Sequence, residues 1–239
     1  MSNNKDFNKG LLLTASGSFW WGFIGVIYFK YISFVGHIEV VIHRCLWTTI
    51  TLIFTSIIFS KFNIIIKIFK DKKKMILLLL SGLLIFINWS VWIYAVSIDR
   101  IIDASFGYFI MPIISVFLGY FFFKEKFSIK GKISMIIVVI SIFFLIFSDF
   151  KSIPWVGLIV ALSWSFYNLV RKKIKVQTDI GLLIESLFIL PAILFAFYFI
   201  VQNNVNDFDI ANPKLMFILM LAGPMTVIPL FLYVRGVEY

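Results

Sequence analysis

The sequence is dominated by apolar runs that are each about as long as a bilayer is thick. The clearest run is Ala104–Phe123, which holds twenty residues without a charge. A helix needs about twenty apolar residues to cross the hydrocarbon core, and there it satisfies its own backbone hydrogen bonds. Runs of this length, in place of alternating segments of about ten residues, indicate membrane-spanning helices.

Composition places the chain in the same class. It is 61% hydrophobic with only 14% charged residues, and its mean hydropathy is +1.00. We therefore predict an all-α fold, a polytopic transmembrane helix bundle, rather than a soluble domain. Eight spans are expected: Gly10–Phe29, Ile38–Ser60, Met75–Ser97, Ala104–Phe123, Ile133–Ser148, Ile153–Val170, Ile180–Val201 and Leu215–Val234.

The basic residues predict the orientation of these spans. With the N-terminus inside, seventeen of the 22 Lys and Arg residues fall in inside segments and four in outside segments, while Arg44 lies within a span. Such an excess of positive charge marks the cytoplasmic side. We expect a multi-pass protein of the cell (inner) membrane with a cytoplasmic N-terminus. Because this topology explains the net charge of +10, nucleic acid is not expected as a partner.

Few residues suit cofactor or metal chemistry. One cysteine, Cys45, and two histidines allow neither an internal disulfide nor a Cys-rich or His-rich metal cluster. The sequence also has no Ser/His/Asp pattern and no phosphate-binding loop. We predict no cofactor, no metal and no enzymatic activity.

Two short likenesses indicate an internal repeat. Phe19–Gly22 in the first span resembles Ser165–Asn168 in the sixth, and Glu39–Arg44 in the second resembles Gly181–Ser186 in the seventh. The two copies are offset by five spans. Because five is an odd number, the second copy is inverted in the membrane, as in many transporters. We predict two inverted five-helix repeats, residues 1–149 with helices 1–5 and residues 150–239 with helices 6–8 only. Eight of ten helices would then be present, in a piece of a longer protein or in a bundle that another chain completes.

Ionisable residues inside spans are the first candidates for a site, because a charge there costs ~2.5–3.5 kcal/mol on insertion scales. Glu39 and His43 share one face of the second span at i,i+4, and Arg44 follows. Together they suit a zwitterionic or anionic solute. The alternative is that Glu39 caps the helix and Arg44 snorkels. Glu185, alone in the seventh span, is a candidate proton carrier or an interfacial glutamate that pairs with a loop lysine.

The third span offers an amide beside aromatic walls. Asn88 and Trp92 share a face at i,i+4, and this combination suits a small organic ligand or cation. An interhelical hydrogen bond is the alternative role for Asn88. We add Tyr108 and Asn168 to the predicted substrate-binding lining, and we consider His43 and Glu185 for proton coupling.

Glycine and proline mark the predicted close contacts and hinges. Gly107 shares a face of the fourth span with two other small residues, which lets another helix approach closely. Pro112, Pro191 and Pro229 each lack an N–H within a span and free a carbonyl one turn earlier. These prolines suit a protein that changes shape around a cavity, or simple structural kinks.

Read in order, these features resemble the RarD subfamily of EamA-type transporters, in the drug/metabolite transporter superfamily. The likeness covers nearly the whole chain. It rests on the runs Asn88–Trp89, Ala104–Pro112, His43–Trp47, Leu169–Ile174 and Gly181–Glu185. It implies a ten-helix inner-membrane permease with both ends cytoplasmic, associated with chloramphenicol sensitivity. The chain departs from the family at Met111, where members usually have Asn.

The sequence therefore predicts a transmembrane transporter, a permease or exporter of small organic solutes such as amino acids, metabolites or drugs, that works by alternating access. Its expected partners are a small-molecule substrate and the lipid bilayer, and the oligomeric state stays open. The alternative is a truncated, non-transporting membrane protein that packs with a partner.

Overall fold

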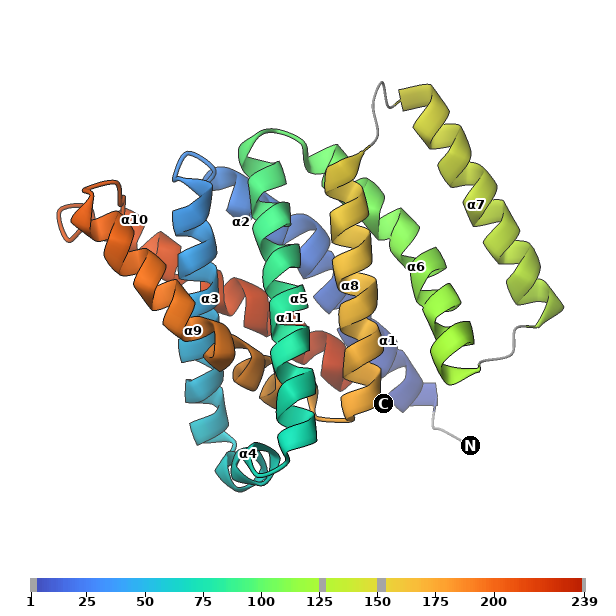
Figure 1. Cartoon of the computed structure of the whole chain (residues 1–239), viewed down its shortest axis with the longest axis horizontal. Coiled ribbons are helices and arrows are strands. Elements are labelled where there is room, and N and C mark those ends of the chain that lie inside the picture. The colour runs from blue at the N-terminus through green and yellow to red at the C-terminus, as the bar shows by residue number, and fades with distance from the viewer. Residues whose placement is uncertain (1–3, 125–127, 150–153, 238–239) are drawn as a thin grey trace. The chain divides into compact units, whose positions relative to one another are not determined.

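The computed structural model describes residues 4–124, 128–149 and 154–237, and within these ranges every regular element is helical. Figure 1 shows the elements in chain order. They are α1 (Asn4–Phe19), the π-helical turn η1 (Trp20–Gly25), α2 (Val26–Tyr31), α3 (His37–Ile58), α4 (Phe62–Phe69), α5 (Lys72–Ser97), α6 (Ile101–Phe123), α7 (Ile129–Asp149), α8 (Trp155–Ile174), α9 (Thr178–Gln202), α10 (Pro213–Met220) and α11 (Ala222–Val237).

Six helical segments in the described residues are long and apolar enough to cross a membrane. They are Asp6–Tyr31, His37–Ile58, Lys72–Ser97, Ile101–Phe123, Thr178–Gln202 and Pro213–Gly236. Each matches one of the eight predicted spans, which confirms a polytopic helical bundle. The other two predicted spans fall in α7 and α8, which are helices of 21 and 20 residues. The predicted start of the sixth span, Ile153, lies outside the described residues.

The chain forms two compact units. The first comprises Met1–Gly82 and Val176–Tyr239, and the second comprises Leu83–Lys175. The long helix α5 begins in the first unit and continues into the second. This grouping in space is separate from the two inverted sequence repeats, which stay a prediction.

In the first unit, α11 packs against both α1 and α3, and α3 also packs against α9. Glycines stand where the backbones come closest. A Cβ on Gly17 of α1 would lie 2.8 Å from the carbonyl oxygen of Pro229, and Gly223 of α11 faces the backbone of Trp47 in the same way. In lipid such small residues let helices gain van der Waals contact, since there is no hydrophobic drive between them.

The prolines that were predicted as hinges lie inside helices. Pro112 is within α6, Pro191 within α9 and Pro229 within α11, and each helix continues past its proline. The last predicted span is instead interrupted at Leu221, between α10 and α11. Pro224 lies in the first turn of α11, where a missing N–H leaves no intrahelical bond unmade.

In the second unit, α6 packs against α8 at a pair of glycines. A Cβ on Gly157 would lie 2.5 Å from the carbonyl oxygen of Asp103, and one on Gly107 would meet the backbone of Gly157. Further along the same pair of helices, the Ser165 hydroxyl donates a 3.2 Å hydrogen bond to the carbonyl oxygen of Met111. The carbonyl of Met111 on α6 is thus bonded by the facing helix α8.

The glycine pair predicts a strong effect of a single methyl group. We expect Gly157→Ala to force α6 and α8 apart and to lower the free energy of unfolding by ~1–3 kcal/mol, as overpacking does. The temperature at which the protein in detergent loses its monodisperse size-exclusion peak would measure this loss of stability. Gly131→Ala is the control, because a Cβ there would meet only the Ser128 hydroxyl, at 3.5 Å. Equal thermal stability of Gly157→Ala and the parent chain would contradict the close contact.

Candidate functional site

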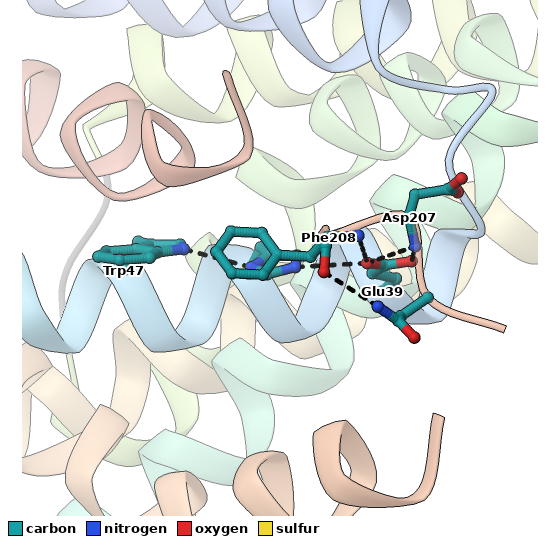
Figure 2. A network of polar contacts seen from close by, with 6 residues as sticks. Glu39, Trp47, Asp207 and Phe208 are labelled. Carbon is teal, nitrogen blue, oxygen red and sulfur yellow. Dashed lines mark hydrogen bonds and ion pairs between the residues drawn. The ribbon is translucent and has the colours of Figure 1, made fainter. Parts of the chain in front are cut away.

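A row of polar side chains runs along one face of α3, in the first unit. Glu39, His43 and Trp47 are spaced at i, i+4 and i+8, so that each lies one turn from the next. Glu39 and His43 are buried, with 3% and 0% of their surface exposed. Figure 2 shows the row and the loop that closes over its Glu39 end.

Glu39 holds the loop that follows α9. Its carboxylate accepts hydrogen bonds of 2.8 and 3.0 Å from the backbone N–H of Asp207 and one of 2.9 Å from that of Phe208. The Asn206 side-chain amide donates to the Phe208 carbonyl at 2.9 Å and stiffens the same turn. Hydrogen bonds to an ionised carboxylate are about twice as strong as neutral ones. The charge of Glu39 is therefore met by backbone amides of a segment 168 residues away.

His43 links Glu39 to Trp47. Its Nδ1 accepts a 3.2 Å hydrogen bond from the Trp47 indole N–H, and its Nε2 lies 3.5 Å from Glu39 Oε1. The second ring nitrogen, Nε2, faces the carboxylate at a separation that is long for a hydrogen bond. Phe208 and Phe197 flank the ring, with centroids 4.6 and 5.6 Å away. The three side chains thus lie in series along α3, with the indole next to the imidazole and the imidazole next to the carboxylate.

Arg44 points elsewhere. Although it follows His43 directly, its guanidinium carbon lies 4.8 Å from the centroid of the Phe29 ring, on α2, in a cation–π contact. The structure therefore brings Glu39 and His43 together and directs Arg44 to a different neighbour. One residue along a helix turns a side chain by about 100°, which accounts for the separation.

The sequence did not reveal Asp207 and Phe208 as partners of α3. The only local signal is the length of the connection Gln202–Lys214, one of the two longest in the chain. Asp207 is largely exposed beside the site, but partial loss of solvent around its carboxyl group and the nearby charge of Glu39 raise the pKa of that group above the usual range. A negative charge on Asp207 therefore weakens the set of hydrogen bonds from the Asp207 and Phe208 backbone to Glu39, which we call the Glu39 clamp.

Glu185 forms a second polar centre in the first unit. It is fully buried on α9, and the Ser81 hydroxyl donates a 2.5 Å hydrogen bond to its Oε1. Gly82, the next residue on α5, lets the helices meet: a Cβ there would lie 3.1 Å from the Glu185 carbonyl oxygen. The loop residue Lys61 pairs with Asp179 at 2.5 Å, and this pair lies ~9 Å from Glu185 along α9 at 1.5 Å per residue.

The other predicted lining residues belong to the second unit. Asn88 donates 3.1 Å hydrogen bonds to the Val160 carbonyl and the Ser163 hydroxyl of α8, which is the interhelical role considered as its alternative. Trp92 packs against a buried apolar cluster of α5, α6 and α8. Tyr108 and Asn168 are exposed. Asn88 thus serves helix packing within its unit.

Comparison with known proteins supplies the family context. The EamA-like transporter family matches residues 8–147. The chain is 33% identical to "Protein RarD" of Salmonella typhi over 229 residues, which cover 96% of the chain and 77% of that protein. It is 31% identical to an uncharacterized transporter of Vibrio cholerae over 231 residues, 97% of the chain and 76% of that protein. It is 31% identical to the uncharacterized transporter YojE of Bacillus subtilis over 235 residues, 96% and 77% respectively.

No solved structure matches the chain. The family model and two of these relatives are named as transporters, a kind of protein distinct from enzymes. Among the residues that the structure describes, no three His, Cys, Asp or Glu side chains gather in a way that could hold a metal ion.

The Glu39 clamp predicts local unfolding on mutation. We expect Glu39→Ala to free the loop, so that the amide hydrogens of Asp207 and Phe208 exchange with solvent at least about tenfold faster, because hydrogen bonds to charged groups contribute ~1.5–3 kcal/mol. Hydrogen–deuterium exchange with peptide-level mass spectrometry measures this.

Asp207→Asn is the matched control for this experiment. It removes a charge from the same loop but keeps the backbone N–H that Glu39 binds, so exchange at Phe208 stays as slow as in the parent chain or becomes slower. Unchanged exchange in Glu39→Ala would show that the loop is held by other contacts.

Proposed function

Since this chain belongs to the EamA-like transporter family, and within it to the RarD subfamily, we propose that it moves small organic solutes across the membrane by alternating access, with Glu185 as the proton-coupling group. The substrates that we propose are amino acids, related metabolites or drugs. The proposal extends to the inverted repeats, residues 1–149 and 150–239, and to insertion in the inner membrane with a cytoplasmic N-terminus.

The observation that carries the proposal is the environment of Glu185. A fully buried carboxyl group in a membrane-spanning helix is costly when charged, and ionisable groups in such positions are candidates for proton relays. The Ser81 hydroxyl holds Oε1 at 2.5 Å. A carboxyl group so placed gains a proton when it is shut off from water and loses it when one side opens, which couples proton movement to a conformational change.

The roles of Glu39 and His43 follow from the clamp. We predicted both as substrate ligands, and in this conformation the Glu39 carboxylate is filled by backbone amides of the loop. A solute with an amide or ammonium group could take the place of those amides only when the loop moves away. We therefore propose that Glu39 and His43 act in a second state, in which the 203–212 loop is displaced.

The decisive experiment is transport in proteoliposomes. We expect accumulation of one or more members of a panel of amino acids and chloramphenicol when a pH gradient is imposed. A gradient of one pH unit drives about tenfold accumulation if one proton moves per solute. Glu185→Gln should abolish this accumulation while leaving exchange of solute down its own gradient, because the amide cannot release a proton.

Ser81→Ala is the control for the Glu185 variant. It removes the hydroxyl but leaves the carboxyl group in place, so accumulation should persist, with an altered pH dependence. Accumulation by Glu185→Gln equal to that of the parent chain would eliminate the coupling role and leave transport itself standing. Absence of flux for every panel member would favour the alternative, a non-transporting membrane protein.

A further inference from the structure

The connection between α3 and α5 has a structure of its own. Lys61–Lys74 contains the short helix α4, which in Figure 1 is viewed along its axis at the ends of α3 and α5. The eight residues of α4 are too few to cross a bilayer. A helix placed across the ends of two spans lies at the depth of the lipid headgroups.

The side chains of α4 divide into faces. Ile65 and Ile68 are buried, with 7% and 6% of their surface exposed, and attach the helix to the first unit. Phe62, Ile66 and Phe69 are 48%, 52% and 46% exposed. Their spacing of four and then three residues places them on one face of the helix. The first unit thus leaves an apolar stripe of α4 uncovered.

Lysines surround this stripe. Lys61–Lys74 holds six lysines and a single acid, Asp71. Two of the six are neutralised, since Lys61 pairs with Asp179 and Lys74 with Asp71. The remaining four are exposed: Lys67, Lys70, Lys72 and Lys73. Four exposed positive charges therefore lie within α4 or a few residues after it, in the same connection as the exposed aromatic and aliphatic groups.

Asp71 keeps the lysines that follow it in place. Its carboxylate accepts a 3.1 Å hydrogen bond from the backbone N–H of Lys74 and so caps the first turn of α5. That hydrogen bond, together with the charge of Lys74, lowers the pKa of Asp71, which stays ionised near neutral pH. The cap fixes the start of α5, and with it the positions of Lys72 and Lys73 in the first turn.

We propose that α4 and the four exposed lysines form a binding surface for anionic phospholipids. Phe62, Ile66 and Phe69 would enter the boundary between headgroups and acyl chains, as the apolar faces of interfacial helices do. The lysine stems extend along that boundary and their ammonium groups reach the lipid phosphates. Clusters of four or more basic residues next to a transmembrane helix attract anionic lipid in this way.

The apolar stripe distinguishes this surface from lysines that only set the membrane topology. Topology alone requires lysines on one side of the membrane, but it does not require exposed aromatic and aliphatic groups at helical spacing beside them. A nucleic acid or an acidic protein would engage the lysines and leave the stripe in water. A lipid surface takes both chemistries at once.

Native mass spectrometry of the full chain in detergent tests the proposal, with phosphatidylglycerol and phosphatidylcholine of identical acyl chains as probes. We expect the parent chain to bind the first phosphatidylglycerol at least about fivefold more tightly than phosphatidylcholine, given the attraction contributed by each lysine near a lipid phosphate. Changing Lys67, Lys70, Lys72 and Lys73 together to Gln should remove this preference.

Two control variants separate a specific surface from total charge. The first changes four exposed lysines elsewhere to Gln and should keep the preference: Lys124, Lys130, Lys173 and Lys175. The second changes Lys67, Lys70, Lys72 and Lys73 to Arg, which retains the charge, and should also keep the preference. This variant would show that the four positions tolerate substitution without loss of the fold.

Three outcomes would overturn the proposal. The first is that the Gln variant of Lys67, Lys70, Lys72 and Lys73 keeps the preference. The second is that the Gln variant of the control lysines loses as much of the preference as this variant does. The third is displacement of phosphatidylglycerol by millimolar inorganic phosphate, which would reveal a site for small anions in place of a lipid-facing surface.

Discussion

The close approach of helix backbones is the constraint on which the rest of this structure depends. In a bilayer, apolar side chains gain little by leaving lipid for protein, so helices associate through contact and interhelical hydrogen bonds. Gly17, Gly82 and Gly223 supply the contact in the first unit, and Gly107 with Gly157 supplies it in the second. At Gly82 and along the α6–α8 pair, the close approach also lets polar groups of the two helices meet.

Those polar groups explain how charge is kept inside an apolar bundle. Ser81 reaches Glu185 from the position next to Gly82, and Asn88 reaches α8 within the unit that the glycine pair holds together. Glu39 draws on the backbone of a loop instead of a lysine or arginine. Burial of a polar or ionisable group is costly unless hydrogen bonds replace water, and the partner is a hydroxyl at Glu185, a helix backbone and a hydroxyl at Asn88, and loop amides at Glu39.

The positions of the spans could be predicted from sequence because length and hydropathy are local properties. The resemblance to EamA transporters was likewise visible in short runs and is confirmed by the family match. Side-chain partners could not be predicted in the same way. Periodicity placed Glu39 beside His43, yet the approach of Asp207 depends on how a distant loop folds back, which no local pattern encodes. For Asn88 the pattern offered two roles; its hydrogen bonds to α8 show the interhelical one, and substrate binding stays a prediction.

The hydrogen bonds between Glu39 and the loop constrain how the sequence of this region can change in evolution. Within the loop, the Glu39 carboxylate accepts hydrogen bonds only from main-chain N–H groups. Every residue type except proline has such a group. These hydrogen bonds therefore do not depend on which side chains occupy positions 207 and 208, but they do require the carboxylate of Glu39 on α3. Substitution at position 207 by any residue except proline therefore leaves these hydrogen bonds possible, whereas Asn206 and Phe208 also contribute side-chain contacts to the closed loop.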